Sequence, residues 1–183
     1  KMKKIKGFTM IEMLIVIAVL GILAAALLAT IDPFEQMKKA RDTTVRNSAI
    51  DYLDAITRYY AVKGAMPWHS TAGGGDNCLS GAAPDGTPLA NMSGCTDVLI
   101  NAGELKAGFT SAIAGNASKI FVTGAAENAP DPAKVVVCFQ PDSKSIRRDN
   151  NTRCNNKGSE YCDNTTQTCY WCTDVSGCSG GGT

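Results

Sequence analysis

Residues 8–31 read FTMIEMLIVIAVLGILAAALLATI, and this run decides the fold of the first part of the chain. Glu12 is the only charged residue in the run. At about 1.5 Å per residue, a helix of this length reaches roughly 36 Å and can cross a hydrocarbon core of about 30 Å. The run therefore predicts a transmembrane helix.

A short basic leader precedes this helix. Residues 1–7 read KMKKIKG, with four lysines and no acidic residue. Such residues favour keeping that end of the chain in the cytoplasm, so we expect the rest outside the membrane. A cleaved secretory signal explains the run less well, because its apolar region spans only about 7–15 residues. A plain signal anchor is the other alternative.

Glu12 is the unusual residue of the run. A carboxylate inside an apolar span is costly and needs a partner, yet no Lys, Arg or His follows before residue 32. A cut between Gly7 and Phe8 would create an α-amino group four residues before Glu12. That cation could neutralise the carboxylate, within one chain or from a neighbouring chain. The alternative is that Glu12 lies near the lipid headgroups and stays solvated.

Residues 3–17, KKIKGFTMIEMLIVI, resemble the class III signal of type IV pilins and type II secretion pseudopilins. The resemblance implies that a prepilin peptidase cuts after Gly7 and methylates Phe8. It also implies that Glu12 aligns subunits as they leave the membrane for a filament. In this family Gly21 and Pro33 would mark places where the helix loosens inside the filament. The likeness is specific over residues 3–31 and weaker up to residue 68.

A second helical pattern follows at residues 32–63. One stripe of apolar side chains recurs every three to five residues: Phe34, Met37, Ala40, Val45, Ala49, Leu53, Ile56 and Tyr60. Lys63-Gly64 provides a basic last turn and a glycine stop. Although Asp32-Pro33 could kink or end a helix, the pattern predicts one helix from Phe8 to Lys63, whose amphipathic second half packs on a head.

Residues 64–183 are expected to form that globular head. The predicted strands cover residues 119–123, 134–139, 145–148 and 168–172, and a short helical turn is expected within 99–109. These elements indicate an α+β fold, in which a small antiparallel sheet packs on the helix. Together with the resemblance, they imply a pilin fold: a long amino-terminal helix and a disulfide-stapled head.

All eight cysteines lie in the head: Cys78, Cys95, Cys138, Cys154, Cys162, Cys169, Cys172 and Cys178. An even number outside a membrane indicates up to four disulfides, but eight cysteines allow 105 pairings. We expect Cys78–Cys95 to close a loop and Cys138–Cys154 to close a hairpin, with the last four cysteines pairing among themselves. Zinc binding or redox chemistry at Cys169-x-x-Cys172 is less favoured, because no second close pair and no βαβ context accompany it.

No catalytic, metal or cofactor site is predicted. His69 is the only histidine, and it lies in a turn where we expect it to be solvated. Four aspartates lie in loops without the ordered spacing of a calcium site: Asp85, Asp131, Asp142 and Asp149. The chain has 18 basic and 17 acidic side chains, a net charge of +1, which argues against a dedicated nucleic-acid binder.

The resemblance implies a structural protein and not an enzyme. The expected function is that of a major pilin, processed by prepilin peptidase and polymerised with identical subunits by the pilus assembly machinery. The chain would be a single-pass protein of the cytoplasmic membrane before assembly and part of an extracellular filament afterwards. A pseudopilin or minor pilin is the first alternative. A membrane-anchored adhesin that never polymerises is the second.

Overall fold

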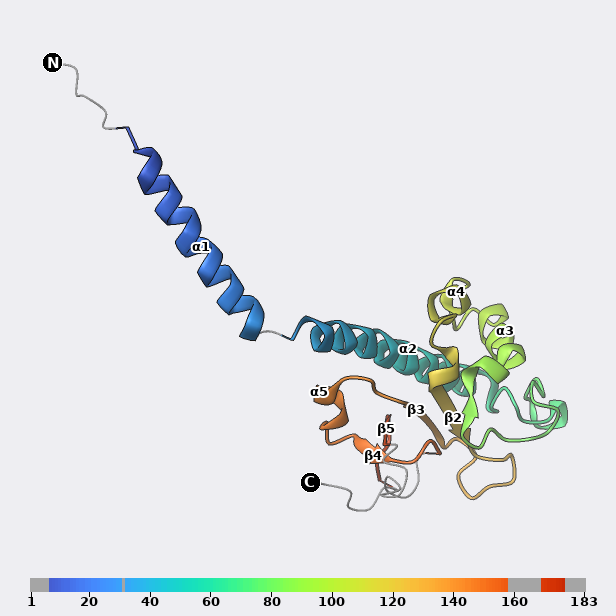
Figure 1. Cartoon of the computed structure of the whole chain (residues 1–183). Helices are drawn as coiled ribbons and strands as arrows, with labels where there is room; N and C mark the ends of the chain where they lie inside the picture. Colours follow the sequence, from blue (N-terminus) through green and yellow to red (C-terminus); the bar gives the residue numbers. More distant parts are fainter. Residues whose placement is uncertain (1–6, 31, 158–168, 177–183) are drawn as a thin grey trace. The chain divides into compact units, whose positions relative to one another are not determined.

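The computed structural model describes residues 7–30, 32–157 and 169–176 (Figure 1). Two compact units divide the chain, Lys1–Met37 and Lys38–Thr183. The first unit holds the helix α1 (Met10–Thr30) and the first turn of α2 (Pro33–Lys63). The second unit holds the rest of α2 and the head.

Two helices take the place of the single helix predicted from Phe8 to Lys63. The Asp32 carboxylate accepts hydrogen bonds from the backbone N–H groups of Phe34 (3.1 Å) and Glu35 (3.2 Å), as a helix N-cap does. Pro33 is then the first residue of α2, where its missing N–H is no loss. The prediction of one continuous helix is therefore wrong, because this cap starts a new helix. The predicted end at Lys63 is confirmed.

The head is built around one face of α2. The buried apolar residues of this helix are spaced at three and four positions: Val45, Ala49, Tyr52, Ala55, Ile56 and Tyr59. The predicted stripe meets this face only in part. Phe34 and Met37 are 75% and 55% exposed, whereas Tyr52 and Tyr59, which the prediction left out, are almost fully buried.

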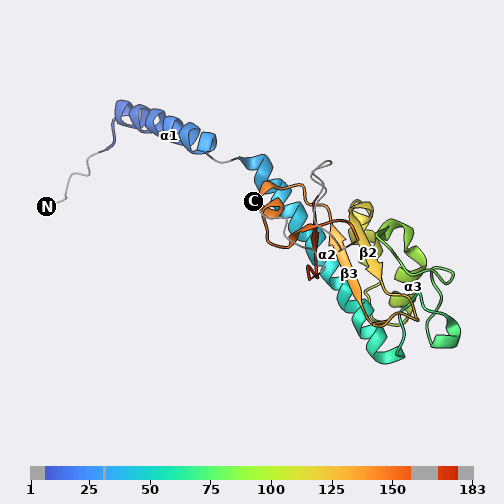
Figure 2. The same cartoon turned by 90° about the horizontal axis from the view of Figure 1, so that it is seen from below.

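Five short strands form one antiparallel sheet in the order β1-β2-β3-β5-β4. They are β1 (Thr87–Pro88), β2 (Ile120–Gly124), β3 (Val135–Phe139), β4 (Thr152–Cys154) and β5 (Tyr170–Cys172). Three short helices complete the head: α3 (Ser93–Asn101), α4 (Phe109–Ile113) and α5 (Lys144–Arg147). Both views show β2 and β3 running along α2 (Figure 1 and Figure 2). The predicted α+β class, an apolar helix with a small antiparallel sheet, is confirmed.

One predicted strand is a helix. Residues 145–148 fall in and directly after α5, which begins after Ser143. The Ser143 hydroxyl accepts a hydrogen bond from the backbone N–H of Ile146 (3.4 Å) and so caps the helix. Ile146 is the only apolar residue of the predicted strand, so no alternating pattern opposed this turn. The other three predicted strands correspond to β2, β3 and β5, while β1 and β4 were not predicted.

The two faces of the sheet bury different side chains. Ile120, Val122, Val137 and Phe139 belong to the main core with the α2 face. A smaller cluster lies on the opposite face of the sheet: Val136, Cys138, Cys154 and Cys172. Alternation along β3 sends Val137 to one core and Cys138 to the other, as the period of two in a strand requires.

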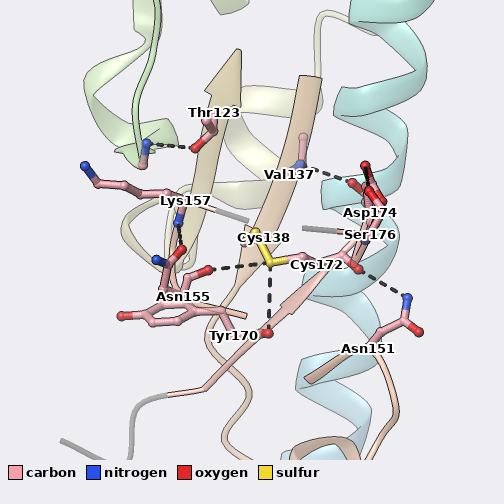
Figure 3. The surroundings of a disulfide bond; sticks show 12 residues. Thr123, Val137, Cys138, Asn151, Asn155, Lys157, Tyr170, Cys172, Asp174 and Ser176 are labelled. Atoms are coloured by element: carbon pink, nitrogen blue, oxygen red, sulfur yellow. Dashed lines mark hydrogen bonds between the residues drawn. A yellow bond between two sulfur atoms is a disulfide. The ribbon is translucent and has the colours of Figure 1, made fainter. Parts of the chain in front are cut away.

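A disulfide joins the two central strands of the second face (Figure 3). Cys138 of β3 lies opposite Cys172 of β5, with a Cα–Cα distance of 4.1 Å, and the two are bonded. The predicted Cys138–Cys154 pair is therefore wrong, as is the pairing of Cys172 within the last four cysteines. The reason is the strand order: β5 lies between β3 and β4, so Cys154 faces Tyr170 instead of Cys138.

The other cysteines complete this pattern only in part. Cys78–Cys95 is bonded as predicted, with a Cα–Cα distance of 4.9 Å. Cys154 and Cys169 are also disulfide-bonded. Cys162 and Cys178 lie outside the described residues. Because Cys169 and Cys172 both belong to disulfides and Cys172 pairs with Cys138, the C-x-x-C motif is not a zinc or redox pair.

Candidate processing and assembly site

The Gly7–Phe8 junction lies in non-helical backbone ahead of α1. Phe8 is 74% exposed. A Cβ added at Gly7 would meet no atom within 4 Å. Nothing in the described fold therefore requires a glycine at position 7. A requirement for glycine there would come from an enzyme that binds this junction.

Thr9 and Glu12 form a reciprocal cap at the start of α1. The Glu12 Oε2 atom accepts hydrogen bonds from the backbone N–H (2.8 Å) and the hydroxyl (2.6 Å) of Thr9. In return, the Thr9 Oγ1 atom accepts a hydrogen bond from the Glu12 backbone N–H (3.3 Å). This is the capping box, with the acid three residues after the threonine. The lone carboxylate of the apolar run therefore points back towards the Gly7–Phe8 junction, and not along the helix.

The prediction did not assign a role to Thr9, although a signal for one was present. Thr-x-x-Glu ahead of an apolar run is a sequence pattern for a capping box. The predicted partner of Glu12, an α-amino group on Phe8, requires prior cleavage. In the uncut chain the amide of Thr9 and its hydroxyl take that place.

The surface of α1 is apolar in all directions. Residues 10–28 form one helical stretch long and apolar enough to cross a membrane, by length and composition. Its large apolar side chains are exposed, from 45% at Val16 to 93% at Met10. Such a helix has to be covered by lipid or by other helices. The chain itself supplies no such cover within the described part.

Gly21 and Pro33 differ in their surroundings. Gly21 lies within α1, and an added Cβ would meet no atom within 4 Å. Pro33 begins α2 behind the Asp32 cap. Gly21 thus interrupts no contact, and Pro33 coincides with a helix boundary.

The head shows a different environment for His69 than predicted. The side chain is only 4% exposed, so the expectation of a solvated histidine is wrong. Its Nδ1 atom accepts a hydrogen bond from the Met66 backbone N–H (3.2 Å), which leaves Nε2–H to donate to the Ala125 carbonyl (3.2 Å). The Trp68 indole N–H donates to the same carbonyl (2.9 Å). His69 therefore holds two loops together.

The four loop aspartates do not gather. Asp85 pairs with Lys157 (2.6 Å) and Asp142 with Lys119 (2.5 Å). Asp131 and Asp149 accept backbone hydrogen bonds in their own turns. Within residues 7–30, 32–157 and 169–176, no group of three or more His, Cys, Asp or Glu side chains could hold a metal ion.

Comparison with known proteins supports the amino-terminal site. Residues 2–28 match the family described as the prokaryotic N-terminal methylation motif, so the chain carries a class III prepilin signal. The predicted resemblance is confirmed over these residues. The chain is also similar to fimbrial protein EcpC of Eikenella corrodens, with 38% identity over 69 residues.

These comparisons reach only part of the molecule. The match to the fimbrial protein covers 38% of this chain and 44% of the relative, so the chain spans less than half the length of the curated relative that it matches. No solved structure was found to match the chain. The chain is therefore pilin-like by its signal and first helix, while its head is known from the present structure.

Proposed function

We propose that this chain is a major pilin, the structural subunit of a type IV pilus. A prepilin peptidase cuts after Gly7 and methylates Phe8. Before assembly α1 holds the chain in the cytoplasmic membrane with the head outside, and afterwards α1 helices of many copies pack together. The observation that carries the proposal is a prepilin signal followed by a helix whose apolar side chains are exposed on every side.

Hydrophobic burial supplies the driving force for this assembly. Each buried methylene contributes about 0.8 kcal/mol, and α1 presents large side chains on its whole circumference. Lipid covers them before assembly, and neighbouring α1 helices cover them in the filament. Head-to-tail contacts that do not close then give a helical filament.

Glu12 gives this packing its register. The carboxylate points back to Thr9, one residue from the nitrogen that cleavage turns into an amine. In an apolar filament core an unpaired carboxylate is costly, so its pairing with an amine favours the one alignment that brings the two together. The partners are then identical subunits, the prepilin peptidase and the assembly machinery.

The first experiment is mass spectrometry of the mature amino terminus. The proposal predicts a chain that begins at Phe8 and carries one methyl group on its nitrogen. An intact leader, or a cut near Ala26, would contradict processing as a prepilin. Quantification in sheared surface filaments then identifies the kind of subunit. A chain that dominates the filament is a major pilin, and a trace component is a minor pilin or pseudopilin.

The second experiment tests the role of Glu12. In Glu12→Ala we expect the chain to be cut but not assembled, so that it accumulates in the membrane. Asp51→Ala is the matched control, because it removes an exposed carboxylate from α2. Unchanged surface display of Glu12→Ala, together with no filaments in the wild type, would indicate a membrane-anchored adhesin instead.

A further inference from the structure

The charges of the head are segregated along the chain. Residues 38–50 contain four basic and one acidic side chain, and residues 132–157 contain six basic and two acidic ones. The segment between them, residues 51–131, contains four basic and eight acidic side chains. Whether this segregation becomes a surface feature depends on where the fold places the three segments.

The fold joins the two basic segments. The buried Asp42 carboxylate of α2 accepts hydrogen bonds from the backbone N–H groups of Asp142 (3.0 Å) and Ser143 (2.7 Å). Both residues directly precede α5, so α5 lies beside the first part of α2. Arg41 and Lys119 line one pocket with Asp142, of about 390 Å³. We name this surface the basic end: Arg41, Lys119, Lys144, Arg147 and Arg148.

The anions near the basic end do not cancel its charge. Asp142 is taken up by Lys119, and Asp42 is occupied by the two backbone donors. Arg147 is anchored by a hydrogen bond from Nε to the Pro141 carbonyl oxygen (3.0 Å) and remains exposed. The ion pairs Arg58–Glu104, Lys119–Asp142 and Lys157–Asp85 involve none of Arg41, Arg147 and Arg148.

The acidic segment gathers near the other end of α2. Glu104 contacts Arg58 (3.1 Å between Nε and Oε2), and the Tyr59 hydroxyl donates to Asp76. Asp76 and Glu104 line a pocket of about 340 Å³ with Val62, Val98 and Lys63. We name this surface the acidic end: Asp54, Asp76, Asp97 and Glu104. Arg58 and Lys63 oppose these four carboxylates, which leaves the surface net negative.

The two surfaces lie at opposite ends of the head. Figure 1 and Figure 2 both place α5 beside the first part of α2 and α3 beside its last part. The ends cannot therefore satisfy one another within one head. Arg147 and Arg148 present planar guanidinium groups, which suit carboxylates such as those lining the pocket of the acidic end.

We propose that the basic end of one head docks on the acidic end of the next copy. This proposal rests on the proposed filament function and adds a contact between heads to it. A second copy fits the basic end better than another anionic polymer does, because every copy also carries the complementary surface. The contact joins two different surfaces, so it repeats without closing, as a filament requires. It acts at short range, since salt screens exposed charges beyond about 8 Å at physiological ionic strength.

Charge reversal in the full-length chain tests the contact. The basic variant is Arg147→Glu with Arg148→Glu, and the acidic variant is Asp54→Lys with Asp97→Lys. We expect either variant to lower the yield of sheared filaments about tenfold at equal cellular amounts of subunit, because repulsion replaces attraction at every contact. The chain carrying all four substitutions should recover to within about twofold of the wild type. Lys106→Glu with Lys134→Glu is the control, since both lysines are exposed and lie in neither end.

A second measurement does not depend on filaments. Isotope-labelled and unlabelled full chains are mixed in detergent micelles at low salt and treated with a carbodiimide, which joins a lysine directly to a carboxylate. We expect cross-links from Lys144 of one copy to acidic-end peptides of another, and their loss in the acidic variant. Their absence would overturn the head contact.

The outcomes separate this inference from the proposed function. Wild-type filaments with cleaved, methylated subunits and no effect of either variant would overturn the head contact alone. Loss in the basic variant without loss in the acidic one, and no recovery in the combined chain, would assign the basic end to a different anionic partner. A wild type that is never cut or assembled contradicts the proposed function, and the cross-links still decide the head contact.

Discussion

The two long helices of this chain are stable for different reasons. The 21 residues of α1 bury none of their described side chains, whereas seven of the 31 residues in α2 are buried. The first helix takes its cover from outside the chain, from lipid or from other copies. The second takes it from the head. Helical content alone therefore says little about where the stabilising contacts lie.

This difference divides the effects of substitution. Changes in α1 should alter insertion and assembly and leave the head folded. Changes in the head should alter its free energy of unfolding and leave α1 helical in a micelle. Both tryptophans, Trp68 and Trp171, are buried in the head, so their fluorescence reports on that unit alone.

The largest expected effect on the head comes from its second sheet face. Replacing Cys138 and Cys172 by serine opens a loop of sequence separation 34, and the chain-entropy relation gives a loss of about 4 kcal/mol. Denaturant unfolding of the full chain in micelles, followed by tryptophan fluorescence, measures it. The Cys78–Cys95 bridge has a separation of 17 and should contribute about 3 kcal/mol. Far-ultraviolet circular dichroism should show α1 helical in both variants, and loss of that helix would break the comparison.

A matched pair of substitutions tests the comparison directly. Ile56→Ala deletes a side chain that is fully buried in the head and should lower the free energy of unfolding by about 3 kcal/mol. Ile17→Ala makes the same chemical change in α1, where the side chain is 65% exposed, and should leave tryptophan-detected unfolding unchanged. Equal effects of the two substitutions would mean that α1 packs on the head.

The same contrast explains what the sequence could predict. An unbroken apolar run needs no knowledge of tertiary contacts, so α1 followed from residues 8–31 at once. The buried face of α2 depends on which elements pack against it. For that reason Tyr52 and Tyr59 were missed, while Phe34 and Met37 were included in the stripe. Local patterns placed β2, β3 and β5, whose apolar residues lie together in short runs.

The remaining errors share one cause, contacts between residues far apart in the sequence. The carboxylate that fixes the start of α5 comes from Asp42, 101 positions before Ser143. The pairing of Cys138 depends on β5, which enters the sheet from the end of the chain and separates β3 from β4. His69 is buried because the segment around Ala125 covers it. The caps at Thr9 and Asp32, in contrast, are local and readable from sequence.

Alkaline pH gives a smaller effect that is again confined to the head. Burial raises the pKa of Tyr52 to about 12, although the Thr96 side chain acts in the opposite direction. The unfolded tyrosine ionises near pH 10, so the stability that this group contributes is complete below about pH 10 and is lost as the pH rises to about 12. The loss amounts to about 2 to 3 kcal/mol.

Tyr52→Phe isolates this contribution. The variant should lose less stability than the wild type between pH 10 and 12, although part of the loss should remain, because burial also raises the pKa of Tyr59 and Tyr170. Denaturant unfolding at stepwise increasing pH gives the measurement. An identical pH dependence in wild type and variant would show that Tyr52 ionises normally in the folded head. Since residues 8–31 contain no tyrosine, the helicity of α1 should not change over this range.

The smallest expected effect compares how the two helices begin. Thr9→Val keeps the shape of the side chain at the start of α1 but removes the hydroxyl that donates to Glu12 and accepts from its backbone N–H. Asp32→Ala removes the corresponding acceptor at the start of α2. Each loss should weaken its own helix terminus by about 1 kcal/mol. Amide hydrogen exchange in micelles should show the change as faster exchange of the first helical turn.

The two caps should nevertheless differ in how far their loss spreads. Because α2 packs on the sheet, fraying after Asp32→Ala should stop before Val45, the first apolar residue of its buried face. In α1 no packed side chain opposes fraying, so Thr9→Val should expose amides up to and beyond Glu12, and the carboxylate should lose its fixed direction. Restriction of exchange to one turn in both helices would show that lipid holds α1 as firmly as the sheet holds α2. Wider fraying in α1 alone would mean that the direction of Glu12 depends on Thr9.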